Sequence, residues 1–595
     1  MRLVIRILIC LFYVYTLQAC GQKYTYSDKY DLYFKFDQED IHSQSWNISR
    51  LSWLSSIPGF REEGGPHLIT FFHPEKFPFT RNLIVECEQR ILLPINKEQG
   101  GKVTLFFKGH NIDNSELIVT GLDNEECFLY SDTLKLKVDS SIKTASIDVS
   151  LSDVKLLNIK IAALGLLDRE SSFSMGGVNI FLGEKAIDTY SLTESEQDFN
   201  FPTDRIIPID INSTQGFAKI DSLKRKKIIA VGESVHGSNA IAKIIPRFIQ
   251  QQITQNNCRL VIFEIPLEMA LLYNKYVCDS KFAMDKDYLF GVEFESLLEW
   301  IRNYNSHKGE SEKINVLGMD YCSYLNSENA TSSYIFDYLT SINKDKRSKE
   351  IDSLSIMLLE RPLKESINYL KKQKKLKNEL SLVDYKCISH ILTLSESMGT
   401  DENKRMIARD SVMFENIKFL ISNYCPSEAR TFIYGHSGHL NRISGYPSLP
   451  DVASLGSMMS HYYRDDYYSI TVHVENGSLF LPNEKMIRDC YQLTNFESTL
   501  ETKLGEIGYD TYFTYIPDCL NRPIFSRYVG SIFKKQSFFP FNIYRRYDGI
   551  IFIRNTECDI NAVNERMIFK NLKEHTKSSE NRSKLLNEIK YGYPK

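Results

Sequence analysis

The chain has 595 residues, of which 43% are hydrophobic and 25% are charged, and its formal net charge is −3. This length exceeds what one hydrophobic core supports, so two or three domains are expected, and the composition excludes wholesale disorder. The small negative charge gives no overall basic field, so nucleic acid is not an expected partner.

The amino terminus has the features of a bacterial lipoprotein signal. Basic residues precede an apolar run from Ile7 to Leu17, which is too short for a comfortable transmembrane span. The next residues, Leu17-Gln18-Ala19-Cys20-Gly21, resemble a lipobox, so residues 1–20 are predicted to be a signal segment with a lipid attached to Cys20. The lipid would anchor the protein in the bacterial cell envelope without spanning the membrane. A plain signal peptide and an uncleaved anchor are the alternatives.

The twelve cysteines show no metal or redox motif. None forms a C-x-x-C pair, so neither a zinc ribbon nor a thioredoxin motif is indicated. An exported protein can pair some of its cysteines, for example Cys87 with Cys127, and the sequence leaves that pairing open.

Residues 21–205 are predicted to form an all-β sandwich domain. Short segments with alternating apolar and polar residues recur here and are separated by turn signals. The segments are Val103–Phe107, Leu134–Val138, Ala145–Val149 and Leu157–Ile161, and the expected breaks are Gly100-Gly101, Asp113-Asn114 and Gly176-Gly177. A sandwich ahead of an enzyme serves either as a sugar-binding or docking module or as a spacer from the membrane.

Residues 206–595 alternate between strand-like and helix-like stretches. The strand candidates are hydrophobic runs at 228–231, 260–263, 314–319, 431–435, 468–472 and 549–553, and helical periodicity is clear at 240–253 and 290–304. Only helical patterns occur from about 330 to 425. The fold class predicted for this domain is therefore α/β, with a mostly parallel sheet, flanking helices and an α-helical insertion.

Four of these strands end at ionisable residues. The residues that follow them in chain order are Glu233 and His236, Glu264, Asp320, and His436 and His439. In an open α/β sheet, ligands bind beyond the carboxyl ends of the strands, so these side chains are expected to converge on one crevice. Carboxylates and imidazoles gathered in a crevice are the groups used in acid/base catalysis, so the chain is predicted to be an enzyme.

Six segments, in a fixed order, carry a resemblance to a known family. They are G-E-S-V-H-G at 232–237, F-E at 263–264, N-K-Y-V at 274–277, W-I-R-N-Y-N at 300–305 with G-M-D at 318–320, R-D-S-V-M-F-E-N at 409–416 and H-S-G-H at 436–439. Together they resemble the erythromycin esterases over roughly residues 215–555. Ser437 stands where that family usually has asparagine, and Ala240 and Ile245 stand where an acidic and a basic residue are common, so the substrate is left open.

The resemblance implies hydrolysis of an ester by an activated water, without a metal or a cofactor. His236 would be the general base, because a neutral imidazole can accept a proton near neutral pH. Glu233 and Glu264 would orient this imidazole and share its proton. His436 and His439 would polarise the ester carbonyl or protonate the leaving alkoxide. Arg409 would stabilise the oxyanion that develops on the carbonyl oxygen. The residues expected to support or line the substrate site are Asp320, Glu415, Asn416 and Arg247.

The predicted function is hydrolysis of a carboxylic ester, a lactone or an acylated glycan, and hydrolysis of a macrolide antibiotic is one option left open. Three alternatives are considered. A metal-dependent hydrolase could use the His436-x-x-His439 spacing, and a serine hydrolase could use Ser437 in a sequence similar to a nucleophile elbow. A surface glycan-binding lipoprotein that has lost catalysis is the third. The sequence does not define the oligomeric state.

Overall fold

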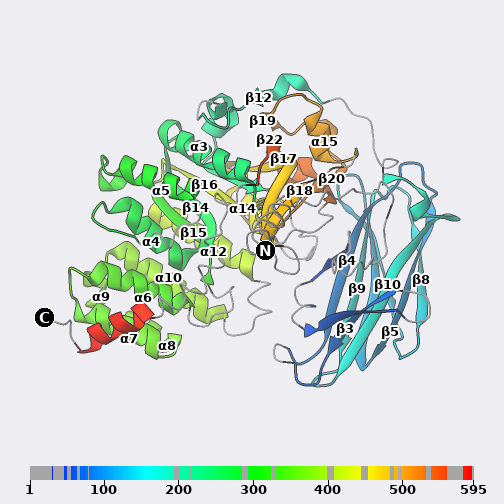
Figure 1. Ribbon diagram of the computed structural model, residues 1–595, viewed down its shortest axis with the longest axis horizontal. Coiled ribbons are helices and arrows are strands. Elements are labelled where there is room, and N and C mark those ends of the chain that lie inside the picture. The colour runs from blue at the N-terminus through cyan, green and yellow to red at the C-terminus, as the bar shows by residue number, and fades with distance from the viewer. Residues whose placement is uncertain are drawn as a thin grey trace, which may run out of the picture.

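The computed structural model describes residues 30, 46–49, 52, 55–62, 67–77, 80–192, 201–213, 216–284, 292–322, 330–398, 408–443, 453–482, 488–493, 495, 497–530, 538–558 and 580–591. The predicted signal and the lipidation site at Cys20 lie outside these residues. No helix among the described residues is long and apolar enough to cross a membrane. Figure 1 shows a β-rich domain, blue to cyan, beside a larger domain in which helices flank a sheet.

The first domain is a sandwich of two antiparallel sheets, as predicted. One sheet has the order β1 (Trp46–Ile48), β4 (Ile84–Leu92), β9 (Leu156–Gly165), β6 (Ile112–Leu122) and β7 (Phe128–Lys135). The other has the order β2 (Ile57–Glu62), β3 (His67–His73), β10 (Ser171–Leu182), β5 (Gly100–His110) and β8 (Lys143–Ser150), with β11 (Lys185–Ala186) paired to β10. Alternate residues of both sheets, such as Leu117 and Val103, are fully buried between them.

Three details of this domain differ from the sequence prediction. Asp113-Asn114 does not break a strand but lies inside β6, where the pairing with β9 shifts between Ile112 and Asn114. Gly176-Gly177 does not break a strand; it lies inside β10, where the pairing with β5 shifts between Met175 and Val178. The glycines therefore form a bulge instead of a turn. The strand expected at Leu134–Val138 is the end of β7, which stops at Lys135.

The second domain is built on a mixed sheet whose centre is parallel, which confirms the predicted α/β fold. Its order is β12 (Ile206–Pro208), β19 (Thr511–Tyr515), β22 (Gly549–Thr556), β17 (Tyr467–Pro482), β13 (Ile228–Glu233), β16 (Arg430–His436), β14 (Cys258–Pro266) and β15 (Asn315–Asp320), with β18 (Arg488–Leu493) paired to β17. The pairs from β15 to β22 along this order are parallel. The strands β12, β18 and β19 are antiparallel additions that the sequence analysis did not predict.

Helices cover both faces of this sheet (Figure 1). Near the first strands lie α3 (Asn239–Gln255), α4 (Leu267–Cys278) and α5 (Val292–Asn305). The predicted helical insertion between β15 and β16 comprises α6 (Ala330–Asn343), α7 (Lys349–Glu360), α8 (Leu363–Lys372), α9 (Leu376–Glu379), α10 (Leu382–Met398) and α12 (Arg409–Tyr424). The central strands are hydrophobic runs because both of their faces are buried, and β13 is buried from Ile228 to Gly232.

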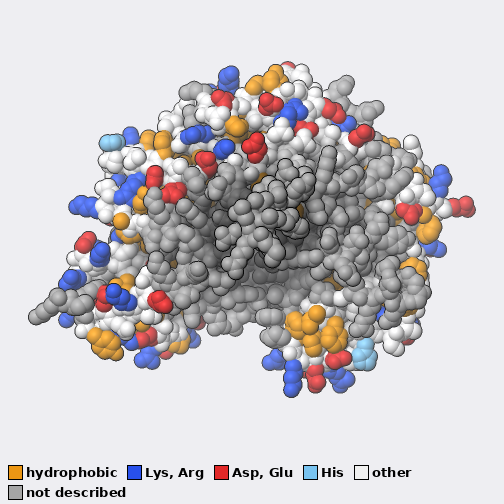
Figure 2. Space-filling view, in the orientation of Figure 1, with side chains coloured by type: hydrophobic (Ala, Val, Ile, Leu, Met, Phe, Trp, Pro, Cys, Tyr) orange, Lys and Arg blue, Asp and Glu red, His pale blue; other side chains and the backbone are white. Residues whose placement is uncertain are grey.

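The remaining elements are short. They comprise the helices α13 (Ser437–Leu440), α14 (Leu455–Tyr463), α15 (Leu500–Gly505) and α16 (Ile543–Arg546), and a separate two-stranded sheet of β20 (Pro523–Arg527) and β21 (Phe538–Asn542). Single 3-10 turns occur at Ile187–Thr189, Thr203–Arg205, Gly216–Lys219, Asp221–Lys224, Glu310–Glu312, Arg464–Asp466 and Asp518–Leu520. Figure 2 shows acidic and basic side chains interspersed over the described part of one face.

The cysteines do not pair as the example in the sequence analysis suggested. Cys87 is fully buried in the sandwich core and Cys127 is exposed, and neither is disulfide-bonded. The disulfide instead joins Cys490 on β18 to Cys558, which follows β22. It therefore ties the outer strand β18 to the end of a central strand.

We expect this disulfide to stabilise the second domain. Cys490 and Cys558 are separated by 68 residues, and closing a loop of this size restricts the unfolded chain. Replacing both cysteines with serine is expected to lower the free energy of unfolding by about 2–4 kcal/mol, measured by urea denaturation. Dithiothreitol should destabilise the wild type and leave the double variant unaffected; equal stability of the two proteins without reductant would contradict the expectation.

Candidate active site

A tight turn after β13 presents two of the predicted site residues. Gly237 has a φ of +75°, and a Cβ at this position would lie 2.5 Å from the carbonyl oxygen of Phe480, so the turn requires glycine. Ser238 then caps α3 by accepting a hydrogen bond from the amide of Ile241. The turn thus places His236, which follows Glu233 by three residues in the sequence, at the carboxyl end of the sheet.

His236, Glu233 and Tyr434 form a hydrogen-bonded row. Nδ1 of His236 lies 2.5 Å from Glu233 Oε1, and the Tyr434 hydroxyl donates to Glu233 Oε2 over 2.5 Å. A carboxylate accepts, so Nδ1 carries the proton and the lone pair of a neutral ring is on Nε2. Nε2 has no hydrogen-bond partner among the described residues, and the side chain is 30% exposed.

Electrostatics favour protonation of His236 and oppose ionisation of Tyr434. Burial lowers the pKa of His236, but the negative charges of Glu233 and Glu264 outweigh it and raise this pKa above its usual value. Burial and the charge of Glu233 hold the pKa of Tyr434 well above its usual range. Tyr434 therefore remains a phenol and keeps donating to Glu233, which orients the imidazole.

Both carboxylate oxygens of Glu264, at the end of β14, accept hydrogen bonds. Oε2 accepts from the backbone amide of His436 over 2.7 Å, and Oε1 accepts from Arg409 Nη2 over 2.8 Å. This approach depends on Gly435, because a Cβ there would lie 2.9 Å from Glu264 Oε2. Burial raises the pKa of Glu264, but the charges of His439, Arg409 and His236 outweigh it and hold this pKa well below its usual range.

Arg409, at the start of α12, joins two strand ends. Its Nη2 also donates to Asp320 Oδ2 over 2.7 Å, its Nε donates to the same oxygen over 3.1 Å, and its Nη1 lies 2.9 Å from His439 Nε2. The guanidinium thus bridges Glu264, Asp320 and His439. This arrangement serves to neutralise buried carboxylates, because each guanidinium nitrogen already faces a protein group.

His439 lies between charges of both signs. Nδ1 lies 2.8 Å from Asp410 Oδ1, while Nε2 lies 2.9 Å from Arg409 Nη1 and 3.3 Å from Glu264 Oε1. A neutral ring would accept from the guanidinium, and a protonated ring would donate to Glu264. Burial lowers the pKa of His439, but Asp410 and Glu264 outweigh burial and Arg409 and raise this pKa to about 9.

His436 has the opposite electrostatic environment. Its Nδ1 accepts from the amide of Gly438 over 3.3 Å, and its Nε2 lies 3.3 Å from the carbonyl oxygen of Val529. Its ring centroid lies 4.7 Å from that of His236. Burial and the neighbouring His236 hold the pKa of His436 well below its usual range, so this ring is neutral and supports His236 by packing.

A cavity of about 420 Å³ opens directly onto this row. The polar residues of its wall are Glu233, His236, Ser238, Glu264, Glu293, Tyr434 and Arg488. Most of the remaining wall is apolar and comes from α3, β14, α5 and β17, including Ile245, Pro246, Phe263, Phe294, Leu297 and Leu481. A mostly apolar cavity with a few convergent polar groups is typical of a small-molecule site.

The structure brings most of the predicted site residues together. Glu233, His236 and Glu264 line the cavity, and Arg409, Asp320, His436 and His439 lie directly behind them. Asn416 is buried behind Asp320, where its Nδ2 donates to the carbonyl oxygen of Met319 over 2.9 Å. Arg409 does not line the cavity wall, although the sequence analysis expected it at the oxyanion.

Arg247 and Glu415 do not line the cavity, so the structure does not bring these two predicted substrate-binding residues to it. Arg247 is exposed on α3 and donates to Gln250 of the same helix. Glu415 is paired with Lys418 on α12, with half of its side chain exposed. Both helices do contact the site, but these two side chains lie on other faces of them.

Two polar contributors were missed by the sequence analysis. Tyr434 precedes His436 by two residues on β16, so the strand's period of two, which places such residues on one face, could have indicated it. Asp410 was not predicted as a site residue, but it binds His439 and also accepts from the amide of Leu455. Among the described residues, no group of three or more histidine, cysteine, aspartate or glutamate side chains is arranged to hold a metal ion.

Residues 385–556 match the model of the erythromycin esterase family, which confirms the predicted resemblance for this part of the chain. The matched region contains Arg409, His436 and His439 and begins after Glu233, His236 and Glu264. The match supports a hydrolase. No curated protein matches the chain.

Several solved structures are similar to parts of the chain. A Bacillus cereus protein is 18% identical with a TM-score of 0.49, over 61% of this chain and 97% of its own. A variant of the erythromycin esterase EreC in its open conformation is 13% identical with a TM-score of 0.41, over 58% of this chain and 95% of its own. A carbohydrate-binding module in complex with β-1,4-galactotriose is 10% identical with a TM-score of 0.19, over 27% of this chain and 100% of its own. Identities and TM-scores this low carry no functional inference.

Proposed function

We propose that the chain hydrolyses a carboxylic ester or lactone with a water molecule activated by His236. The observation that carries the proposal is the position of His236 Nε2 at the wall of the cavity, where it has no hydrogen-bond partner among the described residues while Glu233 and Tyr434 hold the other side of the ring. Both oxygens of Glu233 and of Glu264 already accept hydrogen bonds from protein groups, and the pKa of Glu264 is held well below its usual range, which makes it a weak base. His236 is therefore the group best placed to act as the base.

The chemical steps follow from this placement. Nε2 of His236 accepts a proton from a water molecule, and the water oxygen attacks the ester carbonyl to form a tetrahedral intermediate. The intermediate collapses by breaking its bond to the leaving oxygen, which takes the proton from the imidazolium. The products are a carboxylic acid and an alcohol. Glu233 stabilises the imidazolium formed in the first step, and Arg409 acts at a distance, by holding Glu264 in place.

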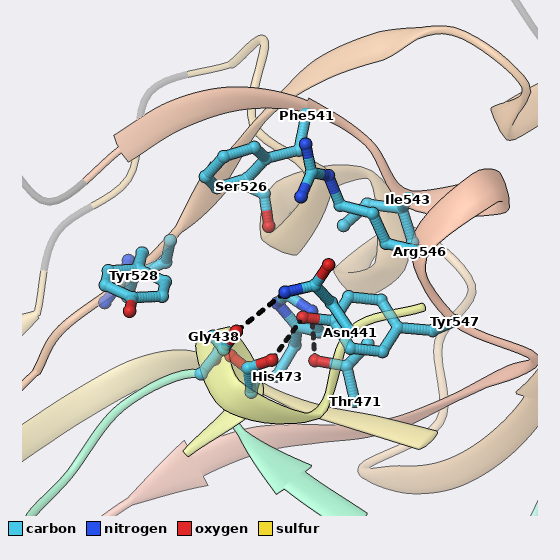
Figure 3. A pocket seen from close by; sticks show the side chains of 13 residues that line it. Gly438, Asn441, Thr471, His473, Ser526, Tyr528, Phe541, Ile543, Arg546 and Tyr547 are labelled. Carbon is cyan, nitrogen blue, oxygen red and sulfur yellow. Dashed lines mark hydrogen bonds between the residues drawn. The ribbon is translucent and has the colours of Figure 1, made fainter. Parts of the chain in front are cut away.

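The serine-hydrolase alternative finds little support in the position of Ser437. This residue is 3% exposed and lines a separate cavity of about 20 Å³, which is the space of roughly one water molecule. Figure 3 shows this small cavity between Gly438, Asn441 and Thr471 on one side and Ser526 and Arg546 on the other. An ester cannot enter a space of this size.

The apolar wall of the large cavity favours an ester with an extended apolar part. Ile245 occupies a position where the related family commonly has a charged residue, and here it faces the cavity together with Pro246 and Leu297. A polar glycan would match Ser238, Glu293 and Arg488 but leave the larger, apolar part of the wall without matching contacts, whereas an alkyl or ring substituent would bury that part. We therefore propose an apolar ester in preference to an acylated glycan.

The export and lipid attachment of the protein remain proposals from the sequence. The segment ending in Cys20 motivates them, and a lipid there would hold the enzyme at the cell envelope.

Replacing His236 with alanine is expected to lower kcat for p-nitrophenyl esters by roughly 10²–10⁴-fold, because the general base is lost. The matched control is His307→Ala, which removes an exposed histidine elsewhere in the same domain. Both variants should retain the circular dichroism spectrum of the wild type. EDTA should leave the activity of the wild type unchanged; loss in EDTA with recovery on adding zinc or manganese would support the metal-dependent alternative instead.

Glu233→Gln is expected to move the pH profile to lower pH. His236 must be neutral to accept a proton, so kcat/KM rises as pH increases through its pKa, which Glu233 raises above the usual 6.5. Removing the carboxylate charge lowers this pKa, so the rising limb shifts toward acid while the plateau falls because the ring is less well oriented. If kcat/KM rises at the same pH in the wild type and in the variant, Glu233 does not raise the pKa of His236.

Chain length is expected to control turnover of simple esters. Each methylene that enters the apolar cavity contributes about 0.8 kcal/mol, which allows up to a roughly fourfold gain in kcat/KM per carbon. We expect kcat/KM to rise from p-nitrophenyl acetate to longer acyl chains, or from ethyl to octyl acetate if the alcohol occupies the cavity. Leu297→Gln should reduce the gain in kcat/KM per carbon and leave kcat/KM for the acetate ester unchanged. No response in either series would contradict an apolar substrate.

A further inference from the structure

A carboxylate from the sandwich domain is inserted into the second domain. Glu126 lies in the turn between β6 and β7 and has a φ of +60°, a backbone conformation that residues other than glycine rarely adopt. The turn is fixed by Asp123, whose Oδ1 accepts from the amides of Glu125 and Cys127. An unusual conformation held in this way indicates that the surrounding structure determines where the side chain points.

The Glu126 side chain is 4% exposed and connects three donors. Oε2 accepts from Arg90 of its own domain over 2.9 Å and from Arg546 of the second domain over 2.6 Å, while Oε1 accepts from the backbone amide of Asn542 over 2.5 Å. The two arginines and the amide outweigh burial and lower the pKa of Glu126 to about 2. This carboxylate is therefore charged at any physiological pH.

The contact continues as an apolar patch. Leu92, Leu122 and Leu156 of the sandwich pack with Phe525 and Phe538, which belong to β20 and β21. We refer to β20, β21 and residues 528–530 as the strap. One side of the strap is thus held by the sandwich through Glu126 and these leucines.

The other side of the strap holds the turn that carries His236. The amide of Val529 donates to the carbonyl oxygen of Ser234 over 2.8 Å, and the amide of His236 donates to the carbonyl oxygen of Val529 over 3.0 Å. The same carbonyl lies 3.3 Å from Nε2 of His436. A short backbone pairing therefore fixes both the turn and the ring that packs against His236.

We propose that Glu126 is a positioning residue of the active site, through which the sandwich domain holds the strap and thereby the His236 turn. The sandwich is then a part of the catalytic assembly and not only a spacer or a docking module. The activity part of this inference rests on the function proposed for His236; the structural part does not.

The test uses the full-length protein with Glu126→Gln and Glu126→Ala. Asp132→Asn is the matched control, because Asp132 is an exposed carboxylate on β7 of the same domain. Hydrogen–deuterium exchange is measured for peptides covering 228–240 and 523–530, with β17 peptides reporting global folding. We expect at least tenfold faster exchange in the first two regions of both Glu126 variants, with unchanged β17 peptides and an unchanged control.

Activity is measured on the same proteins with a p-nitrophenyl ester. We expect kcat to fall at least tenfold in Glu126→Ala with KM changed less than twofold, and to fall less in Glu126→Gln, which retains an acceptor oxygen. Unchanged exchange in the turn and strap of the folded variants would overturn the inference whatever the activity. Faster exchange in a protein whose wild type hydrolyses no ester would retain the positioning role and refute the proposed function.

Discussion

The site depends on the burial of the Glu264 carboxylate at the end of β14. A buried charge is costly unless it is paired and hydrogen-bonded. Here the partners come from separate segments: Arg409 is 145 residues away in the sequence, and the amide of His436 is 172 residues away. Because these partners are needed to offset one charge, β14, β16 and α12 are brought into a single arrangement, and the strand end that carries His436 is fixed beside His236.

This charge network leads to a division of roles among similar side chains. His436 is kept neutral by burial and by its neighbour His236, whereas the carboxylates around His439 favour its charged form. Glu233 is held by Tyr434 on one oxygen and by His236 on the other. Among the residues described, His236 combines a ring nitrogen that has no hydrogen-bond partner in the protein with access to the cavity. Environment, and not residue type, separates the proposed base from the residues that support it.

The strand ends were predictable from the sequence, whereas the pairing of side chains was not. Hydrophobic runs such as 228–231 mark central parallel strands, and their carboxyl ends define the crevice. The orientation of Arg409 toward Glu264 and Asp320 depends on contacts between distant segments, so the sequence suggested an oxyanion role instead. Arg247 lies away from the cavity for a local reason. It follows Ile245 and Pro246, and a rotation of about 100° per residue turns its side chain from the cavity to solvent.

The connection between the two domains follows from the backbone of the turn after β13. Its amide and carbonyl groups lie beyond the ladder of the parallel sheet, and buried backbone groups require partners. Val529 supplies partners for the carbonyl of Ser234 and the amide of His236. It follows β20, which pairs with β21 in a two-stranded sheet and is joined to the rest of the second domain by a β-bridge between Phe525 and Thr499. A two-stranded sheet is marginally stable by itself. The sandwich provides the apolar and charged surface that such a pair of strands needs. A spacer would require no contact of this kind, so the contact supports the positioning role proposed for the first domain.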